Sequence, residues 1–268
     1  MSTIEAGGSG KNSRSKRKEN VDYDSSWFTD KVEEKLYNRV WVRNGAMIER
    51  ELDLVTLENL GIEFLQNFMG RGWISLTMFK VELILTLCQE FMVNIKYKPV
   101  TERGKEKLIS WVLRKKLKVI PDTFAEVFEI PREKNPEFEL LDIRMPNLAT
   151  ISHELLLEGE EWDGEVQCNK TRLKDGYLIL FLFSCHSLLP LKRTVSMSVT
   201  RASLLWAIST GITIDLLRMM FMSLCAAHTT LDMRSFVPFT GFLTELFKRN
   251  YELEDGDEYP HDYVGRGV

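Results

Sequence analysis

The chain has 268 residues, of which 44% are hydrophobic, 28% charged and 10% aromatic; this composition excludes a wholly disordered or fibrous protein. A chain of this length can bury a core without disulfides or metal ions. Its formal net charge of -4 excludes a uniformly basic nucleic-acid-binding protein.

The charge is concentrated at the two ends. The first 20 residues carry a net charge of +3 and the last 19 carry -5, so the body is nearly neutral. Low-complexity, charge-rich ends are typical of disordered segments. We therefore predict a disordered basic leader over residues 1–24, a mostly helical domain over 25–250 and an acidic disordered tail over 251–268.

The leader contains a short basic cluster, Lys16, Arg17 and Lys18. Clusters of this kind are recognised by importins, and they also occur in ordinary solvated tails. The cluster favours nuclear targeting as one alternative and an unspecialised tail as the other.

Cysteine usage and hydropathy indicate the compartment. Four cysteines are too few for a disulfide scaffold, and we expect a reducing intracellular location. The most hydrophobic stretch, Tyr177–Leu191, has 15 residues, whereas a membrane span needs about 20. We expect no membrane association.

Helical spacing dominates the first part of the body. Apolar residues recur every three or four positions over 27–44 and over 57–68, and a third helix fits Thr77–Gln89. The second stripe ends at Gly70-Arg71-Gly72, and we expect Trp73 to anchor this break in the core.

The period then changes from helical to alternating. Phe91, Val93 and Ile95 alternate with Met92, Asn94 and Lys96. Val100–Arg103 is followed by a turn at Gly104 and by the apolar run Leu108–Leu113. This pattern predicts a small antiparallel β element near residues 91–113.

The remainder again favours helices, so that the fold class is mainly α, a helical bundle-like domain with that one β element. One expected helix starts at Pro121-Asp122-Thr123 and is stopped by Ile130-Pro131. The others are Asn147–Leu157, Thr171–Leu188, Thr200–Thr210, Ile214–Ala227 and Thr240–Arg249.

The usual catalytic and metal-binding motifs are absent from the sequence. It has no C-x-x-C pair, no G-x-S-x-G elbow and no Walker A loop. Cys185 is adjacent to His186, and Cys225 lies one helical turn before His228. Both cysteines lie in apolar segments, where packing in the core is the favoured role. We expect no metal and no cofactor.

Carboxylates leave one catalytic alternative open. A two-metal nuclease needs acidic side chains that converge on its ions, and Asp142, Glu154 and Asp163 lie in charged segments that favour a solvated role. Asp215 lies in an apolar segment, where capping of the next helix is the simpler interpretation.

A basic run is the one candidate binding site. Cations near Trp111 and Tyr97 permit phosphate contacts combined with base stacking, although cations on a hairpin edge also protect it from aggregation. The candidate nucleic-acid-binding residues are Arg103, Lys105, Lys107, Arg114, Lys115, Lys116 and Lys118.

Short motifs between Val40 and Asn250 give the sequence a resemblance to a known family. They are, in order, Arg71-Gly72-Trp73, Gln89–Ile95, Val100–Lys105, Trp162, Leu188-Leu189-Pro190, Val199–Leu205, Ile208–Gly211 with Ile214-Asp215, Phe236–Phe239 and Leu243–Leu246. Their number and order resemble the plant family called "putative plant transposon protein domain". Met92 stands where that family usually has Tyr, and Leu191 follows Pro190 without the usual motif histidine.

The resemblance implies an origin more than an activity. The family occurs in plant proteins linked to long-terminal-repeat retrotransposons of the Athila type, and it has no established catalytic site. It implies a non-catalytic interaction domain that contacts protein partners or nucleic acid. A gag-like assembly or nucleic-acid-binding module and a metal-dependent nuclease remain as alternatives, so enzymatic activity is left open.

Overall fold

The structure is a computed structural model that describes the greater part of the chain. The described residues are 31, 34, 35, 45–47, 49, 51–59, 62, 64–95, 98–138, 147–190, 194–229 and 236–251. The predicted basic leader lies outside them. So do residues 252–268 of the predicted acidic tail, whereas Tyr251 is the last residue of a helix.

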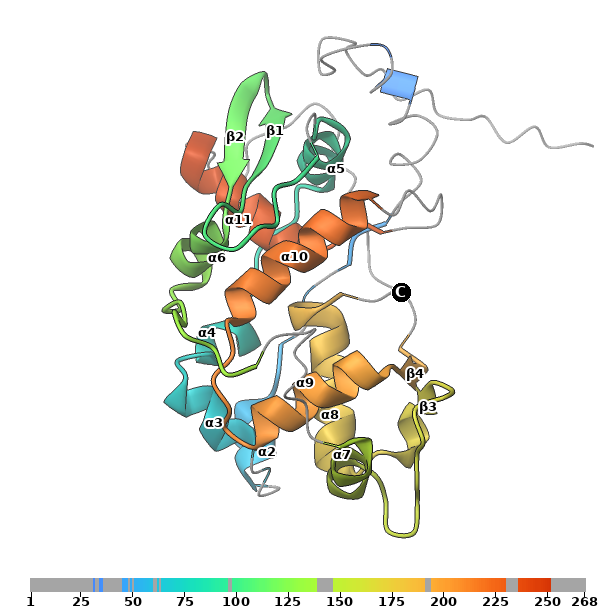
Figure 1. The fold of residues 1–268 in the computed structure, drawn as a ribbon. Helices are drawn as coiled ribbons and strands as arrows, with labels where there is room; N and C mark the ends of the chain where they lie inside the picture. Colours follow the sequence, from blue (N-terminus) through green and yellow to red (C-terminus); the bar gives the residue numbers. More distant parts are fainter. Residues whose placement is uncertain are drawn as a thin grey trace, which may run out of the picture.

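The helices form two neighbouring groups around one continuous hydrophobic core (Figure 1). The first group contains α2 (Leu54–Asn59), α3 (Phe64–Gly70), α4 (Ile74–Thr77), α7 (Leu148–Leu155), α8 (Asp175–Phe183) and α9 (Val199–Ser209). The second group contains α5 (Leu85–Val93), α6 (Pro121–Phe128), α10 (Leu216–Thr229), α11 (Thr240–Tyr251) and a hairpin of β1 (Leu108–Val112) and β2 (Lys115–Val119).

Three small features complete the first group. β3 (Cys168–Asn169) pairs antiparallel with β4 (Ser196–Met197), and a 3-10 turn (Lys170–Arg172) leads toward α8. A π-helical turn, Ser184–Leu188, continues α8. Helices predominate and both sheets have two strands, so the predicted mainly α class is confirmed.

Most of the expected helices are present with shifted ends. α7, α9, α10 and α11 begin and end within two residues of their predicted ranges, and α6 begins at its predicted start and ends before Ile130. The helix expected over Thr171–Leu188 begins only at Asp175. Of the helix expected over 27–44, the structure describes only residues 31, 34 and 35, which are helical.

The helix predicted over Thr77–Gln89 is wrong in its first half. Residues 78–84 are not helical, and exposure alternates as far as Leu83: Phe79, Val81 and Leu83 are half-buried, whereas the residues at 78, 80 and 82 are exposed. The apolar residues in this stretch therefore follow an extended period of two, although they also satisfy helical spacing.

The strand expected from Phe91, Val93 and Ile95 is also wrong, because Phe91 and Val93 belong to α5. All three side chains are buried. A helix that is enclosed by the core is apolar on every side, so alternation along this short run carried no information about a strand.

The β element itself exists, but its partner strand was missed. Leu108–Val112 pairs with Lys115–Val119, a segment that was predicted only as a basic run. The turn at Gly104 is confirmed by its φ of 79° and by the antiparallel bridge from Val100 to Lys107.

Aromatic side chains fill the core. Trp73 is buried and meets the edge of Phe68 at a centroid distance of 5.5 Å, so its predicted role as an anchor is confirmed. Phe124 of α6 stacks on Phe242 of α11 at a centroid distance of 3.9 Å.

Within the described part of the chain, no helix has the length and apolar character needed to cross a membrane.

Candidate nucleic-acid interface

The β1–β2 hairpin has a buried inner face and an exposed outer face. Leu108, Ser110 and Val112 of β1 are buried, as are Leu117 and Val119 of β2. Because side chains alternate along a strand, the residues between them point the other way.

The outer face combines cations with an aromatic ring. Trp111 is paired across the strands with Lys116, and Ile109 with Lys118. Lys107 continues β1 with the same alternation, and all three lysines are exposed. We call these five residues the lysine face.

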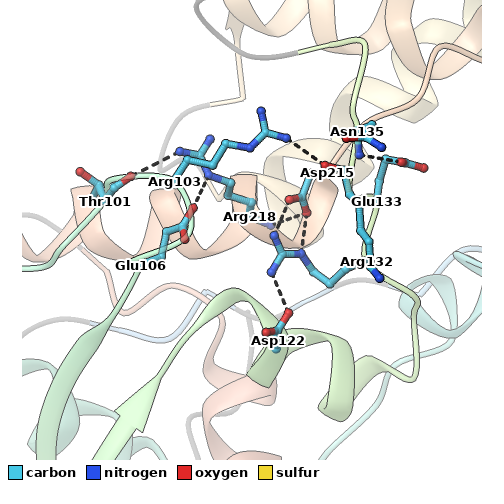
Figure 2. Close-up of polar contacts among 10 residues, drawn as sticks. Thr101, Arg103, Glu106, Asp122, Arg132, Glu133, Asn135, Asp215 and Arg218 are labelled. Atoms are coloured by element: carbon cyan, nitrogen blue, oxygen red, sulfur yellow. Dashed lines mark hydrogen bonds and ion pairs between the residues drawn. The ribbon is translucent and has the colours of Figure 1, made fainter.

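The base of the hairpin is fixed to α10 by Arg218. Its Nε donates to Glu106 Oε1 at 2.7 Å, and its Nη2 donates to the carbonyl of Thr101 at 3.3 Å (Figure 2). The Arg218 and Glu106 side chains are 21% and 7% exposed. The Arg218 guanidinium lowers the pKa of the Glu106 carboxyl, against the effect of partial burial. Charged hydrogen bonds of this kind are stronger than neutral ones.

Asp215 joins this network from the start of α10. Its two carboxylate oxygens accept from Nε and Nη2 of Arg132, and Oδ1 also accepts from the backbone N–H of Arg218 (Figure 2). Arg132 reaches on to Asp122 at the start of α6. The predicted helix cap at Asp215 is confirmed, and a bidentate ion pair is added to it.

The tip of the hairpin is held by Glu90 of α5. Leu113 and Arg114 connect the strands with φ angles of 49° and 63°, a left-handed conformation that costs non-glycine residues roughly 1–2 kcal/mol each. Glu90 Oε1 accepts from the Leu113 N–H at 3.0 Å. This hydrogen bond supports a turn that lacks the glycine or asparagine normally found there.

Glu90 is a buried carboxyl in an incomplete hydrogen-bonding environment. The residue is 1% exposed, and among the described residues its Oε2 has no hydrogen-bond partner. Burial raises its pKa to about 7, although the Leu113 hydrogen bond acts in the opposite direction. Burial and then the charge of Glu90 raise the pKa of Tyr251 to about 12.

The middle of the hairpin is also attached to α5. Asn94 Nδ2 donates to the carbonyl of Trp111 at 3.1 Å, and Ser110 Oγ donates to the carbonyl of Phe91. Base, middle and tip are therefore all held from the inner side, so the lysine face is carried on a rigid support.

The cations of the predicted basic run do not all lie on one face of the hairpin. Lys107, Lys116 and Lys118 share the outer face, and Lys115 lies at the tip with Nζ 5.1 Å from the Tyr251 ring centroid. Arg103 donates to the carbonyl of Lys134 in the loop after α6. The remaining members are Lys105, which pairs with Glu102, and Arg114, which lies in the turn.

Motifs that are distant in sequence meet in the body of the fold. Arg71 Nη2 donates to the carbonyl of Ile212 at 2.6 Å, and Asn67 Nδ2 donates to the carbonyl of Ser209, also at 2.6 Å. Together they bind carbonyls at the end of α9. The Arg71-Gly72-Trp73 and Ile208–Gly211 motifs thus form one structural junction.

A comparison with protein families gives a match over most of the chain. The profile described as "putative plant retrotransposon-related domain" matches residues 69–252. The chain belongs to this family. Neither the curated proteins nor the solved structures contain a match to it.

In this plant retrotransposon-related domain, several motif residues hold segments of the fold together. Arg201 is buried and donates to Ser184 Oγ at 3.2 Å and to the carbonyl of Leu189 at 2.8 Å. Thr244 accepts from the N–H of Ile84. These contacts place motif residues that are far apart in the sequence at junctions between segments.

The described residues contain no group of three or more His, Cys, Asp and Glu side chains that could hold a metal ion. Glu154 accepts from the Tyr177 hydroxyl and Asp163 from the Glu165 N–H, while Asp142 lies outside the described residues.

All four cysteines are buried and free. For Cys185 and Cys225 this is the core packing that the sequence predicts. Burial raises the thiol pKa of Cys88 and of Cys225 to about 12, so these thiols stay protonated and are poor nucleophiles at neutral pH.

Lys115–Val119 was not predicted as a strand, and Glu90 was not predicted as a support of the hairpin. Glu90 does leave a signal, since it is a single carboxylate within the apolar run Leu87–Val93. Two other predicted sites, Tyr97 and the cluster Lys16, Arg17 and Lys18, lie outside the described residues.

Proposed function

We propose that this domain is a non-catalytic interaction module that binds single-stranded nucleic acid through the lysine face. The observation that carries the proposal is the pairing of Trp111 with Lys116 and of Ile109 with Lys118 on one exposed face. Lysines bind phosphates through charge, and aromatic rings stack on unpaired bases.

The form of the face favours a single strand over a duplex. It is a short two-stranded surface with one half-buried aromatic ring, and base stacking requires bases that are not already stacked in a helix. Three exposed lysines supply few phosphate contacts, so we expect weak binding that depends on salt concentration.

The test is fluorescence anisotropy of a labelled 20-nucleotide oligouridine titrated with the full chain. The double substitution Lys116→Gln and Lys118→Gln should weaken binding by about tenfold and reduce the slope of log K against log salt by about 0.7 for each lost phosphate contact. Trp111→Ala should weaken binding at every salt concentration, because stacking does not depend on counterion release.

A matched control removes two exposed lysines elsewhere, Lys80 and Lys134, with the same change in net charge. If both double variants bind equally, the lysine face is not the binding site. Sedimentation of the same mixtures should give small, discrete complexes; large assemblies that grow with protein concentration would favour the gag-like alternative instead.

A further inference from the structure

The tip of the β1–β2 hairpin lies close to the point where the chain leaves its last helix. α11 ends at Tyr251, and Lys115 Nζ at the hairpin tip is 5.1 Å from the centroid of the Tyr251 ring. In Figure 1 the red end of α11 lies beside β2. Residues that follow Tyr251 therefore start next to the hairpin.

Those residues carry the charge opposite to that of the face. Within the eleven positions after Tyr251 there are six carboxylates and no Lys or Arg; they are Glu252, Glu254, Asp255, Asp257, Glu258 and Asp262. An extended chain advances about 3.3–3.6 Å per residue, so residues 254–258 can reach roughly 10–25 Å from Tyr251. A five-residue strand spans only about 17 Å.

β2 has a free edge and exposed lysines that such a segment can contact. Among the described residues it pairs with β1 alone, so it is an edge strand, and three of its five residues are exposed lysines. Tethering also gives the acidic segment an effective concentration of the order of millimolar at the hairpin, where weak ion pairs can still form.

We propose that the acidic segment 252–262 binds the lysine face of its own chain and competes there with nucleic acid. This inference rests on the proposed function for what the segment competes with, but the docking itself depends only on the lysines and carboxylates. If the segment covers the face about nine-tenths of the time, apparent affinity for an external polyanion falls about tenfold.

Docking is tested directly by zero-length carbodiimide coupling of the full chain, followed by mass spectrometry. Amide links should join Lys116 or Lys118 to carboxylates in 252–262, and these links should disappear in 1 M salt. No link should join Lys80 to the carboxylates in 252–262. Coupling a mixture of isotopically light and heavy chains separates links within one chain from links between chains. No link to the hairpin lysines, or links only between light and heavy chains, would overturn the proposal.

Competition is tested with a full chain whose tail carboxylates are neutralised. The tail variant carries Glu252→Gln, Glu254→Gln, Asp255→Asn, Asp257→Asn and Glu258→Gln. Its control neutralises five exposed glutamates outside the hairpin, by substituting Gln for Glu58, Glu82, Glu158, Glu161 and Glu165. Both variants change the net charge equally, so a general effect of charge appears in both.

The tail variant should bind the labelled oligouridine about tenfold more tightly than the control variant at low salt, and the difference should vanish in high salt. Equal affinity of the two variants overturns the competition. If no variant binds oligouridine and the intrachain links still form, the proposed function fails while docking stands. If the links are absent and oligouridine binding depends on Lys116 and Lys118, docking fails while the proposed function stands.

Discussion

The two faces of the β1–β2 hairpin use their charges in opposite ways. On the inner side, Glu106 is paired with Arg218 and Glu90 accepts from the Leu113 N–H. On the outer side, Lys107, Lys116 and Lys118 are exposed. Buried charges must be paired or hydrogen-bonded to be tolerated, whereas exposed lysines remain available to a partner.

Arginine and lysine are divided in the same way between the body of the fold and the lysine face. Arg71, Arg132, Arg201 and Arg218 each reach at least two groups of the fold, either carbonyls, a hydroxyl or carboxylates. The planar guanidinium suits several directed hydrogen bonds, while lysine acts as a flexible, strongly hydrated point charge. The family motifs therefore include arginines that hold the body together, and the candidate binding surface is made with lysines.

The largest expected effect on stability comes from comparing two tryptophans, Trp73 in the core and Trp111 on the outer face of the hairpin. Trp73→Ala should lower the free energy of unfolding by about 3–5 kcal/mol, because it removes a large buried ring. Trp111→Ala, on the outer face, should cost about 1 kcal/mol or less. Urea denaturation followed by circular dichroism measures both values. Similar losses for the two variants would mean that the outer face is part of the core.

The next effect concerns the carboxyl that supports the hairpin tip. The pKa of Glu90 is about 7 in the folded state against an ordinary value of 4.5, so the folded state holds the proton more tightly. The resulting stability is fully present below pH 4.5 and is lost as the pH rises to about 7. The free energy of unfolding should fall on the order of 2–3 kcal/mol over this range.

Glu90→Gln should remove much of that fall, because glutamine keeps an acceptor for the Leu113 N–H but does not titrate. Denaturation midpoints of both proteins between pH 4.5 and 8 give the comparison. The variant should be the more stable protein at pH 8. Parallel pH profiles would show that Glu90 does not cause the dependence.

A third prediction compares a buried ion pair with an exposed one. Asp215→Ala leaves Arg132 without its bidentate partner and removes the cap of α10, and we expect a loss of about 2 kcal/mol. Lys105→Ala breaks the exposed pair with Glu102 and should cost under about 0.5 kcal/mol. Thermal denaturation at low and high salt separates them, since only the exposed pair is strongly screened.

The sequence predicted the mainly α class because most helices carry strong local signals. Examples are Pro121 at the first position of α6 and Asn147 as the cap of α7. It failed between residues 78 and 95, where the apolar residues fit both helical and extended spacing. Burial on all sides of α5 and the extended path of 78–84 are set by neighbours that lie far away in sequence, such as Thr244.

The candidate site was predictable in composition but not in shape. The basic run and Trp111 were visible, and the hairpin turn was not, because Leu113-Arg114 has none of the residues that usually mark such a turn. That turn depends on Glu90, 23 residues away. Because the turn cannot be recognised in the sequence, the positions of the cations cannot be predicted from it. The sequence does not show that Arg103 and Lys105 lie away from the lysine face, or that Lys116 and Lys118 lie on it with Trp111.

The smallest expected effect on stability is that of the lysine face itself, and it separates two roles for the same residues. Lys116→Gln with Lys118→Gln should change the free energy of unfolding by under about 0.5 kcal/mol, because both side chains are exposed. Lysines on an edge strand also discourage pairing with other chains. If that is their whole role, the double variant will aggregate, as seen by light scattering, with its affinity for oligouridine unchanged. Loss of affinity in a variant that stays monomeric and equally stable assigns them to binding, because neither folding nor aggregation then explains the change.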